Sequence, residues 1–140
     1  MAQKIIRALG CVVIALVATA ANSEIVGVWE GTENGLPSVE LSVQIKDGKV
    51  NGSIGFYFQS RGADGKWQLG DKYVVPLLSP RLEGRSLRFE TIHHKCHDCA
   101  ELGPNNKYQV DFVGDREARL HILKDQKSQN DQRFRLTRRL

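Results

Sequence analysis

The Asp47-Gly48 pair, which lies between two runs of alternating residues, constrains the fold more than any other feature of this chain. Asp-Gly in this setting is typical of a two-residue hairpin turn, because both central residues need positive φ. With this loop, one face collects Ile45 with Val50, Val43 with Gly52, Leu41 with Ile54 and Val39 with Phe56. The other face collects mainly polar pairs, so a single register satisfies both turn chemistry and burial.

The same alternation, interrupted by turn residues, continues along the rest of the chain. A second hairpin with Glu83-Gly84 as its loop aligns Leu78 with Phe89, and no stretch shows sustained helical periodicity. We expect strands at residues 25–33, 37–46, 49–59, 67–77, 79–83, 86–93, 107–113, 117–123 and 132–138. If 79–83 continues the strand before it, the fold is an all-β, eight-stranded antiparallel up-and-down barrel, since closure removes exposed sheet edges. A two-sheet sandwich is the main alternative.

The first 23 residues have the three parts of a secretory signal peptide. Lys4 and Arg7 form a basic start, residues 8–18 are apolar, and Ala18-Thr19-Ala20 supplies the small residues of a cleavage site. The apolar run is short for a bilayer span, although an N-terminal membrane anchor is the alternative interpretation. The sequence therefore predicts a cleaved signal peptide over 1–23 and a single β-barrel domain over 24–140. The mature protein is expected to be periplasmic or extracellular, with no transmembrane segment.

Removal of this leader brings the chain closer to neutrality. Of the 20 basic residues two are lost, which leaves 18 against 16 acidic residues and a charge near +2. The arginines Arg133, Arg135, Arg138 and Arg139 most simply form a solvated outer face, with binding to anionic lipid or polysaccharide as the alternative. An exported chain of this charge is not expected to bind nucleic acid.

The segment His93-His94-Lys95-Cys96-His97-Asp98-Cys99 carries three of the four histidines and both cysteines of the mature chain. In an oxidising compartment a Cys96–Cys99 disulfide is the default, and it constrains the unfolded chain by only about 2 kcal/mol. Zinc and copper prefer imidazole and thiolate, so a metal site excluding the disulfide is the alternative, with ligands from His93, His94, Cys96, His97 and Cys99. No other cofactor is expected. A thioredoxin-type redox site is not predicted, because that site needs a helix N-terminus.

Catalysis is not predicted either, because the chain has no G-x-S-x-G or H-E-x-x-H motif. An eight-stranded barrel is either filled by side chains or wide enough for one small molecule. Aromatic residues gather toward one end of the expected strands, next to the long loops, which favours a ligand site there. We predict a site for a small apolar or amphipathic molecule at Phe56, Phe58, Phe89, His93 and Tyr108. The alternatives are metal handling by the His/Cys loop and a structural or interaction module with a filled core.

Gly27-Val28-Trp29 at the start of the first strand, the up-and-down pattern and the arginine-rich last strand resemble the lipocalin and fatty-acid-binding (calycin) barrels. In those families the tryptophan closes the bottom of the barrel and an arginine of the last strand packs across it. The resemblance implies that Trp29 closes the barrel here, with Arg135 or its neighbours Arg133 and Arg138. The wider G-x-W-x-G opening also resembles uncharacterised exported bacterial proteins, and neither resemblance assigns a ligand.

Overall fold

The computed structural model describes residues 23–96, 98–123 and 133–140, and these residues form one antiparallel β-sheet. Residues 1–22 of the expected signal peptide lie outside the described residues. The strand order is β4-β3-β2-β1-β9-β8-β7-β6-β5, so strands adjacent in the sequence pair with each other except β4 and β5, and β1 pairs with β9. The strands are β1 (Gly27–Glu33), β2 (Leu36–Lys46), β3 (Lys49–Arg61), β4 (Trp67–Pro76), β5 (Leu78–Glu83), β6 (Ser86–Thr91), β7 (Asn106–Phe112), β8 (Glu117–Leu123) and β9 (Arg133–Arg138).

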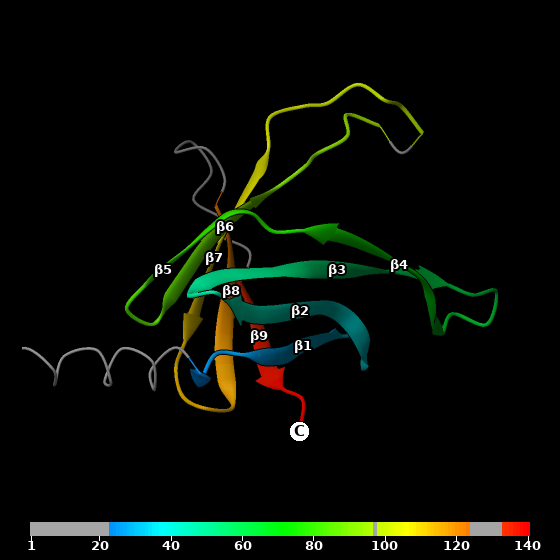
Figure 1. Ribbon diagram of the computed structural model, residues 1–140. Helices are drawn as coiled ribbons and strands as arrows, with labels where there is room; N and C mark the ends of the chain where they lie inside the picture. The colour runs from blue at the N-terminus through cyan, green and yellow to red at the C-terminus, as the bar shows by residue number, and fades with distance from the viewer. Residues whose placement is uncertain (1–22, 97, 124–132) are drawn as a thin grey trace, which may run out of the picture.

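The sheet is curled into a half-barrel whose edge strands are β4 and β5 (Figure 1). The predicted all-β, antiparallel up-and-down architecture is confirmed. The predicted closure into a barrel is not, because the edge strands β4 and β5 do not pair with each other. The sheet has nine strands and not eight, because residues 67–83 form two strands. β4 pairs with β3, whereas β5 pairs with β6 at the opposite edge. Pro76 has no amide hydrogen to donate and ends β4, and Ser79 adopts a φ of 48°. The chain therefore bends here and passes from one edge of the sheet to the other.

The hairpin of β2 and β3 has the register that the sequence predicts. Asp47 and Gly48 have φ values of 52° and 74°, as a turn with two positive φ angles requires. Leu41 lies opposite Ile54, and both side chains are completely buried in the core. Turn chemistry and alternation therefore suffice to define this hairpin.

The hairpin of β5 and β6 differs from its predicted register. Leu82 lies opposite Leu87, and the loop is Gly84-Arg85 rather than Glu83-Gly84. Only Gly84 has a positive φ, at 61°, which fits a turn with glycine at its first central position. Leu78 consequently lies opposite Glu90 and not Phe89, and the pairing is irregular between Leu78 and Arg81.

Trp29 is fully buried in β1 and packs near the ends of several strands. Its Nε1 donates a hydrogen bond of 2.9 Å to the carbonyl oxygen of Ile25. The ring meets Phe112 of β7 edge to face, with centroids 4.9 Å apart, and the guanidinium of Arg138 lies 5.7 Å from the Trp29 ring centroid. The Trp29 side chain of β1 therefore packs against residues of both β7 and β9.

Of the three arginines considered for the contact with Trp29, Arg138 makes it, and not Arg135. Arg138 lies directly opposite Trp29 in the β1–β9 pairing, so the two side chains share a face of the sheet. Arg135 lies three residues away and therefore points to the other face. There it is 75% exposed and forms an ion pair of 3.3 Å with Glu117.

Candidate functional site

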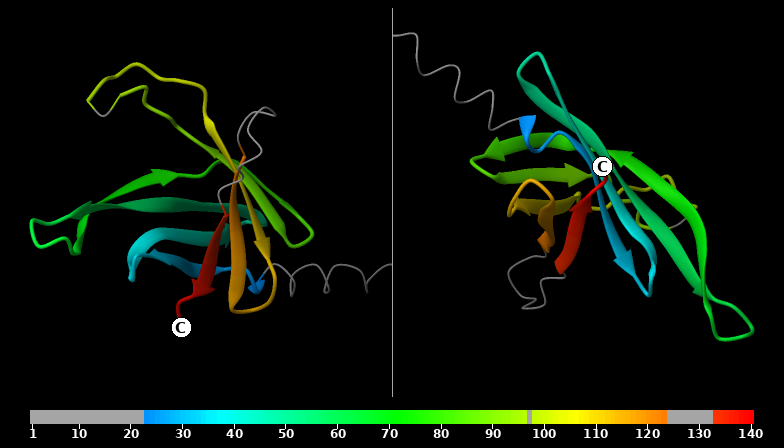
Figure 2. Two further views of the ribbon diagram at one scale, coloured as in Figure 1. Left: turned by 180° about the vertical axis from the view of Figure 1, so that it is seen from behind. Right: turned by 90° about the horizontal axis from the view of Figure 1, so that it is seen from below.

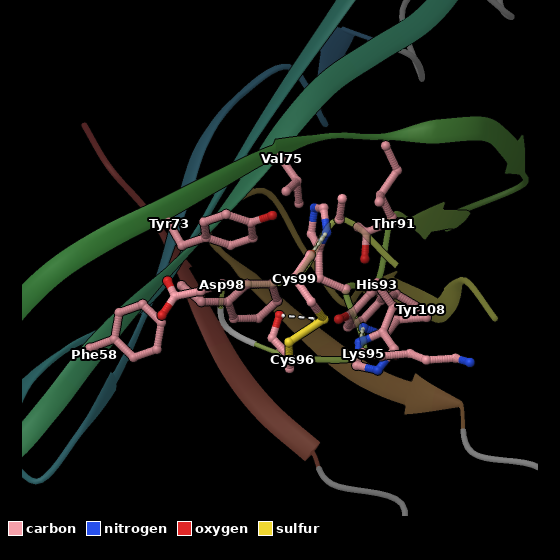
Figure 3. Close-up of a pocket in the computed structure, with 15 residues that line it drawn as sticks. Phe58, Tyr73, Val75, Thr91, His93, Lys95, Cys96, Asp98, Cys99 and Tyr108 are labelled. Atoms are coloured by element: carbon pink, nitrogen blue, oxygen red, sulfur yellow. Dashed lines mark hydrogen bonds between the residues drawn. A yellow bond between two sulfur atoms is a disulfide. The ribbon is translucent and has the colours of Figure 1, made fainter. Parts of the chain in front are cut away.

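A cleft of about 740 Å³ opens on one side of the half-barrel, between the β3–β4 hairpin and the β6–β7 loop of residues 92–105. These two segments project from the same side of the sheet (Figures 1 and 2). We call this space the lateral cleft (Figure 3). Its lining includes Phe56, Phe58, Tyr73 and Val75 from the hairpin, Ile92, His93, His94, Lys95, Cys96, Asp98, Cys99 and Ala100 from the loop, and Thr91, Asn106 and Tyr108 between them.

The hairpin wall of the lateral cleft presents large apolar side chains to solvent. The β3–β4 pairing shifts between Tyr57 and Gln59, and such a bulge bends the strand that carries it. Phe58, at this bulge, is 54% exposed, and Tyr73 is 45% exposed. Both rings therefore offer apolar surface to the lateral cleft.

The loop wall is a short two-stranded ribbon. His94 forms a β-bridge with Leu102. On either side of this bridge, the amide of Lys95 donates a hydrogen bond to the carbonyl oxygen of Glu101, and the amide of Gly103 donates one to the carbonyl oxygen of His93. An ion pair of 2.6 Å between Lys95 Nζ and Glu101 Oε1 adds to the ribbon. At its tip the predicted Cys96–Cys99 disulfide is present, and it faces the lateral cleft (Figure 3).

The described members of the alternative metal set do not converge on one point. Among residues 23–96, 98–123 and 133–140, no three His, Cys, Asp or Glu side chains are grouped to hold a metal ion. His93 Nδ1 lies 3.4 Å from Asn106 Nδ2, whereas His94 Nδ1 lies 3.2 Å from the carbonyl oxygen of Cys99. His97, the remaining histidine of the set, lies outside the described residues.

Three aromatic rings line up from the core toward the lateral cleft. The ring of Tyr108 stacks on Phe89 with centroids 5.2 Å apart, and the Phe56 ring lies 6.0 Å from Tyr108 on a tilt. Of the five predicted ligand-binding residues, Phe56, Phe58, His93 and Tyr108 line the cleft. Phe89 does not, because it lies behind Tyr108 in the core.

The sequence prediction missed Tyr73 and Val75 of the hairpin wall. Tyr73 lies opposite Phe56 in the β3–β4 pairing, so its position on the cleft side follows from that register. The bulge after Tyr57 interrupts the alternation of side chains along β3. The partners of β3 residues in β4 therefore cannot be counted from that alternation. The connection between β3 and β4 contains an Asp64-Gly65 pair, but this pair lies within a longer loop of residues 62–66, where only Gly65 has a positive φ, so it does not set the register as a two-residue turn would.

Burial raises the pKa of the Tyr108 phenol, and hydrogen bonds with Thr91 and Asn106 partly oppose this effect. A raised pKa in the folded state means that folding favours the neutral phenol. This stabilising contribution is complete below the unfolded pKa of about 10 and is lost as the pH rises through the folded value.

We therefore expect Tyr108→Phe to lose less stability in alkali than the wild-type protein does. Urea denaturation followed by circular dichroism from pH 8 to pH 11.5 measures this difference. Tyr73→Phe is the matched control, because the Tyr73 ring is half exposed, and it is expected to follow the wild-type curve. An unchanged pH dependence in Tyr108→Phe would show that the buried phenol does not set the alkaline limit.

The fold and the lateral cleft define a class of protein: an all-β antiparallel half-barrel with an apolar cleft on its open side. In the described part of the chain, no helix has both the length and the apolar character needed to cross a membrane. No protein family, no curated protein and no solved structure matches this chain.

Proposed function

We propose that this protein is an exported, lipocalin-like binding protein whose lateral cleft takes one small apolar or amphipathic molecule. The observation that carries the proposal is the pair of half-exposed rings, Phe58 and Tyr73, on the wall of a cleft of about 740 Å³. Ligand pockets commonly measure about 300–1,000 Å³ and are lined mainly by apolar side chains. Covering one such ring with a ligand contributes up to about 1.5–3 kcal/mol.

Polar groups at the inner end of the lateral cleft favour an amphipathic molecule. Thr91 is buried beside Tyr108. The Nδ2 atom of Asn106 lies 3.4 Å from the Nδ1 atom of His93. A few convergent polar groups in an apolar pocket orient a ligand. The apolar part of the ligand would contact Phe58 and Tyr73, and its polar group would lie near His93.

The centre of the half-barrel is less favourable than the lateral cleft for binding. Its interior is occupied by a core of buried apolar side chains. The largest of those that are fully buried are Trp29, Ile25, Leu41, Ile54, Leu87, Leu120 and Leu136. A ligand placed there would have to displace close-packed side chains. The cleft, in contrast, already exposes its apolar wall.

Two observations support the exported and lipocalin-like parts of the proposal. Disulfides such as Cys96–Cys99 persist mainly in oxidising compartments. The contact of Arg138 with Trp29 is of the kind that the resemblance to lipocalin barrels implies.

Phe58→Ala and Tyr73→Ala are each expected to weaken binding of 8-anilinonaphthalene-1-sulfonate by about 10-fold, which corresponds to about 1.4 kcal/mol. Each substitution removes a large apolar contact with the bound dye. Fluorescence titration of the folded protein gives the Kd. Trp67→Ala is the matched control, since Trp67 is a partly exposed aromatic residue of the same hairpin outside the cleft lining.

Dye binding that survives both Phe58→Ala and Tyr73→Ala, or that Trp67→Ala weakens equally, would contradict a site in the lateral cleft. Absence of dye binding to the wild-type protein would contradict the proposed function itself.

A further inference from the structure

We propose that the Cys96–Cys99 disulfide is a site of thiol–disulfide exchange, whose substrates are thiols attached to an apolar body that occupies the lateral cleft. The inference rests on the proposed function of the cleft and adds a reaction to it. The site is not of the thioredoxin type, because described residues 92–96 and 98–105 contain no helix that would activate a cysteine. Its selectivity comes instead from the position of the disulfide.

The disulfide forms part of the wall of the lateral cleft. Cys96 and Cys99 line the same space as Phe58 and Tyr73, which come from the opposite wall (Figure 3). Cys96 is exposed, whereas Cys99 is partly buried. A molecule that places its apolar part against the two rings therefore holds a thiol group close to an accessible sulfur atom.

The disulfide lies outside the elements that hold the domain together. It closes a loop of four residues beyond the nine strands, which contributes only about 2 kcal/mol through loop entropy. The ribbon below it is held independently by the backbone hydrogen bonds from Lys95 to Glu101 and from Gly103 to His93. Reduction would therefore free the tip while leaving the ribbon and the sheet in place.

The difference in exposure between the two cysteines sets the direction of attack. The substrate thiolate attacks Cys96 Sγ, the bond between the two Sγ atoms breaks, and its electron pair passes to Cys99 Sγ, which takes a proton from water. Cys99 Sγ lies 3.5 Å from the carbonyl oxygen of Cys96 and 4.0 Å from that of Glu101, so the new thiol has acceptors in place.

A second substrate thiolate then attacks the substrate sulfur of the mixed disulfide. The bond to Cys96 Sγ breaks, and Cys96 leaves as a thiolate that is protonated. In sum, two substrate thiols are oxidised to one disulfide and the Cys96–Cys99 disulfide is reduced to two thiols. The protein disulfide is the oxidant, so the step needs no further reactant.

The test compares 4-phenylbutane-1-thiol with glutathione as attacking thiols. The oxidised protein and a synthetic peptide of residues 92–103 with the same disulfide are each mixed with each thiol, and the reaction is followed by mass spectrometry after acid quenching. We expect the ratio of the rates, apolar thiol over glutathione, to be about 10-fold higher for the protein than for the peptide, because binding in the cleft raises the local thiol concentration. The first adduct is expected on Cys96.

Phe58→Ala and Tyr73→Ala are expected to lower this ratio toward that of the peptide, and Trp67→Ala is expected to leave it unchanged. An equal ratio for wild-type protein and peptide, or a first adduct on Cys99, overturns the exchange proposal. The two proposals fail separately: if the wild-type protein and the Cys96→Ala/Cys99→Ala variant bind the dye but the ratio stays at the peptide value, only the exchange is refuted. If no dye binds, the proposed function is refuted.

Discussion

Replacement of Trp29 by alanine is expected to destabilise the domain by about 3–5 kcal/mol, the cost of truncating a buried large aromatic residue. The fully buried Trp29 ring contacts Phe112 and Arg138, and its Nε1 donates to the carbonyl oxygen of Ile25. The substitution thus leaves a cavity where three strands meet. Since a domain of this size is stable by only about 5–15 kcal/mol, much of its stability would be lost. Denaturation in guanidinium chloride, followed by circular dichroism, measures the change.

Trp67 provides the control, because it is the only other tryptophan in the chain. Its ring is 39% exposed and lies under the guanidinium of Arg61, with 5.1 Å between that group and the ring centroid. Trp67→Ala is expected to cost less than about 1 kcal/mol. If Trp29→Ala does not fold, Trp29→Phe gives the measurement, and a cost for Trp29→Phe no larger than that of Trp67→Ala would contradict the central role of Trp29.

Gly52→Ala is expected to cost roughly 3 kcal/mol or more, an unusually large effect for the addition of one methyl group. Gly52 lies opposite Val43 in the β2–β3 hairpin and has a φ of 156°. An added Cβ would lie 1.9 Å from the carbonyl oxygen of Ser42. Because that oxygen belongs to the backbone of a central strand, it cannot rotate away as a side chain does. The midpoint of guanidinium chloride denaturation measures the loss.

Gly65→Ala separates this steric effect from backbone strain alone. Gly65 also has a positive φ, at 76°, but no atom lies within 4 Å of its added Cβ. The cost there is expected to be about 1–2 kcal/mol, the penalty of the left-handed region for an alanine. Equal costs for the two variants would mean that the hairpin relieves the Ser42 contact by moving.

The sequence determined the β2–β3 hairpin because all of its information is local. The Asp47-Gly48 turn fixes the loop, and the alternation on either side leaves one register that buries Leu41 with Ile54. Where the turn signal was less specific, the prediction failed: glutamate, unlike aspartate, rarely adopts a positive φ, and Gly84 occupies the first loop position instead of the second. As a result, Leu78 was predicted opposite Phe89, whereas it lies opposite Glu90 in the structure.

The candidate site could be predicted only in part. Alternation and aromatic content indicated Phe56, Phe58 and Tyr108, and all three line the lateral cleft. Nothing local distinguishes Phe89, which lies behind Tyr108, from a residue that faces the opening. Nor did the sequence show that Phe58 would be exposed at a bulge rather than buried with Phe56.

By itself, then, the sequence determined the all-β antiparallel class and the β2–β3 hairpin, because turn geometry and two-residue periodicity act between near neighbours. Only the tertiary structure decided that β4 and β5 separate to opposite edges, that Arg138 covers Trp29 and that a cleft opens beside the Cys96–Cys99 disulfide. Each of these features depends on how strands distant in the chain curl and meet. Bulges, bends and side-chain contacts fix that arrangement. A shift of one residue in the pairing of two strands moves each side chain of a strand to the opposite face of the sheet.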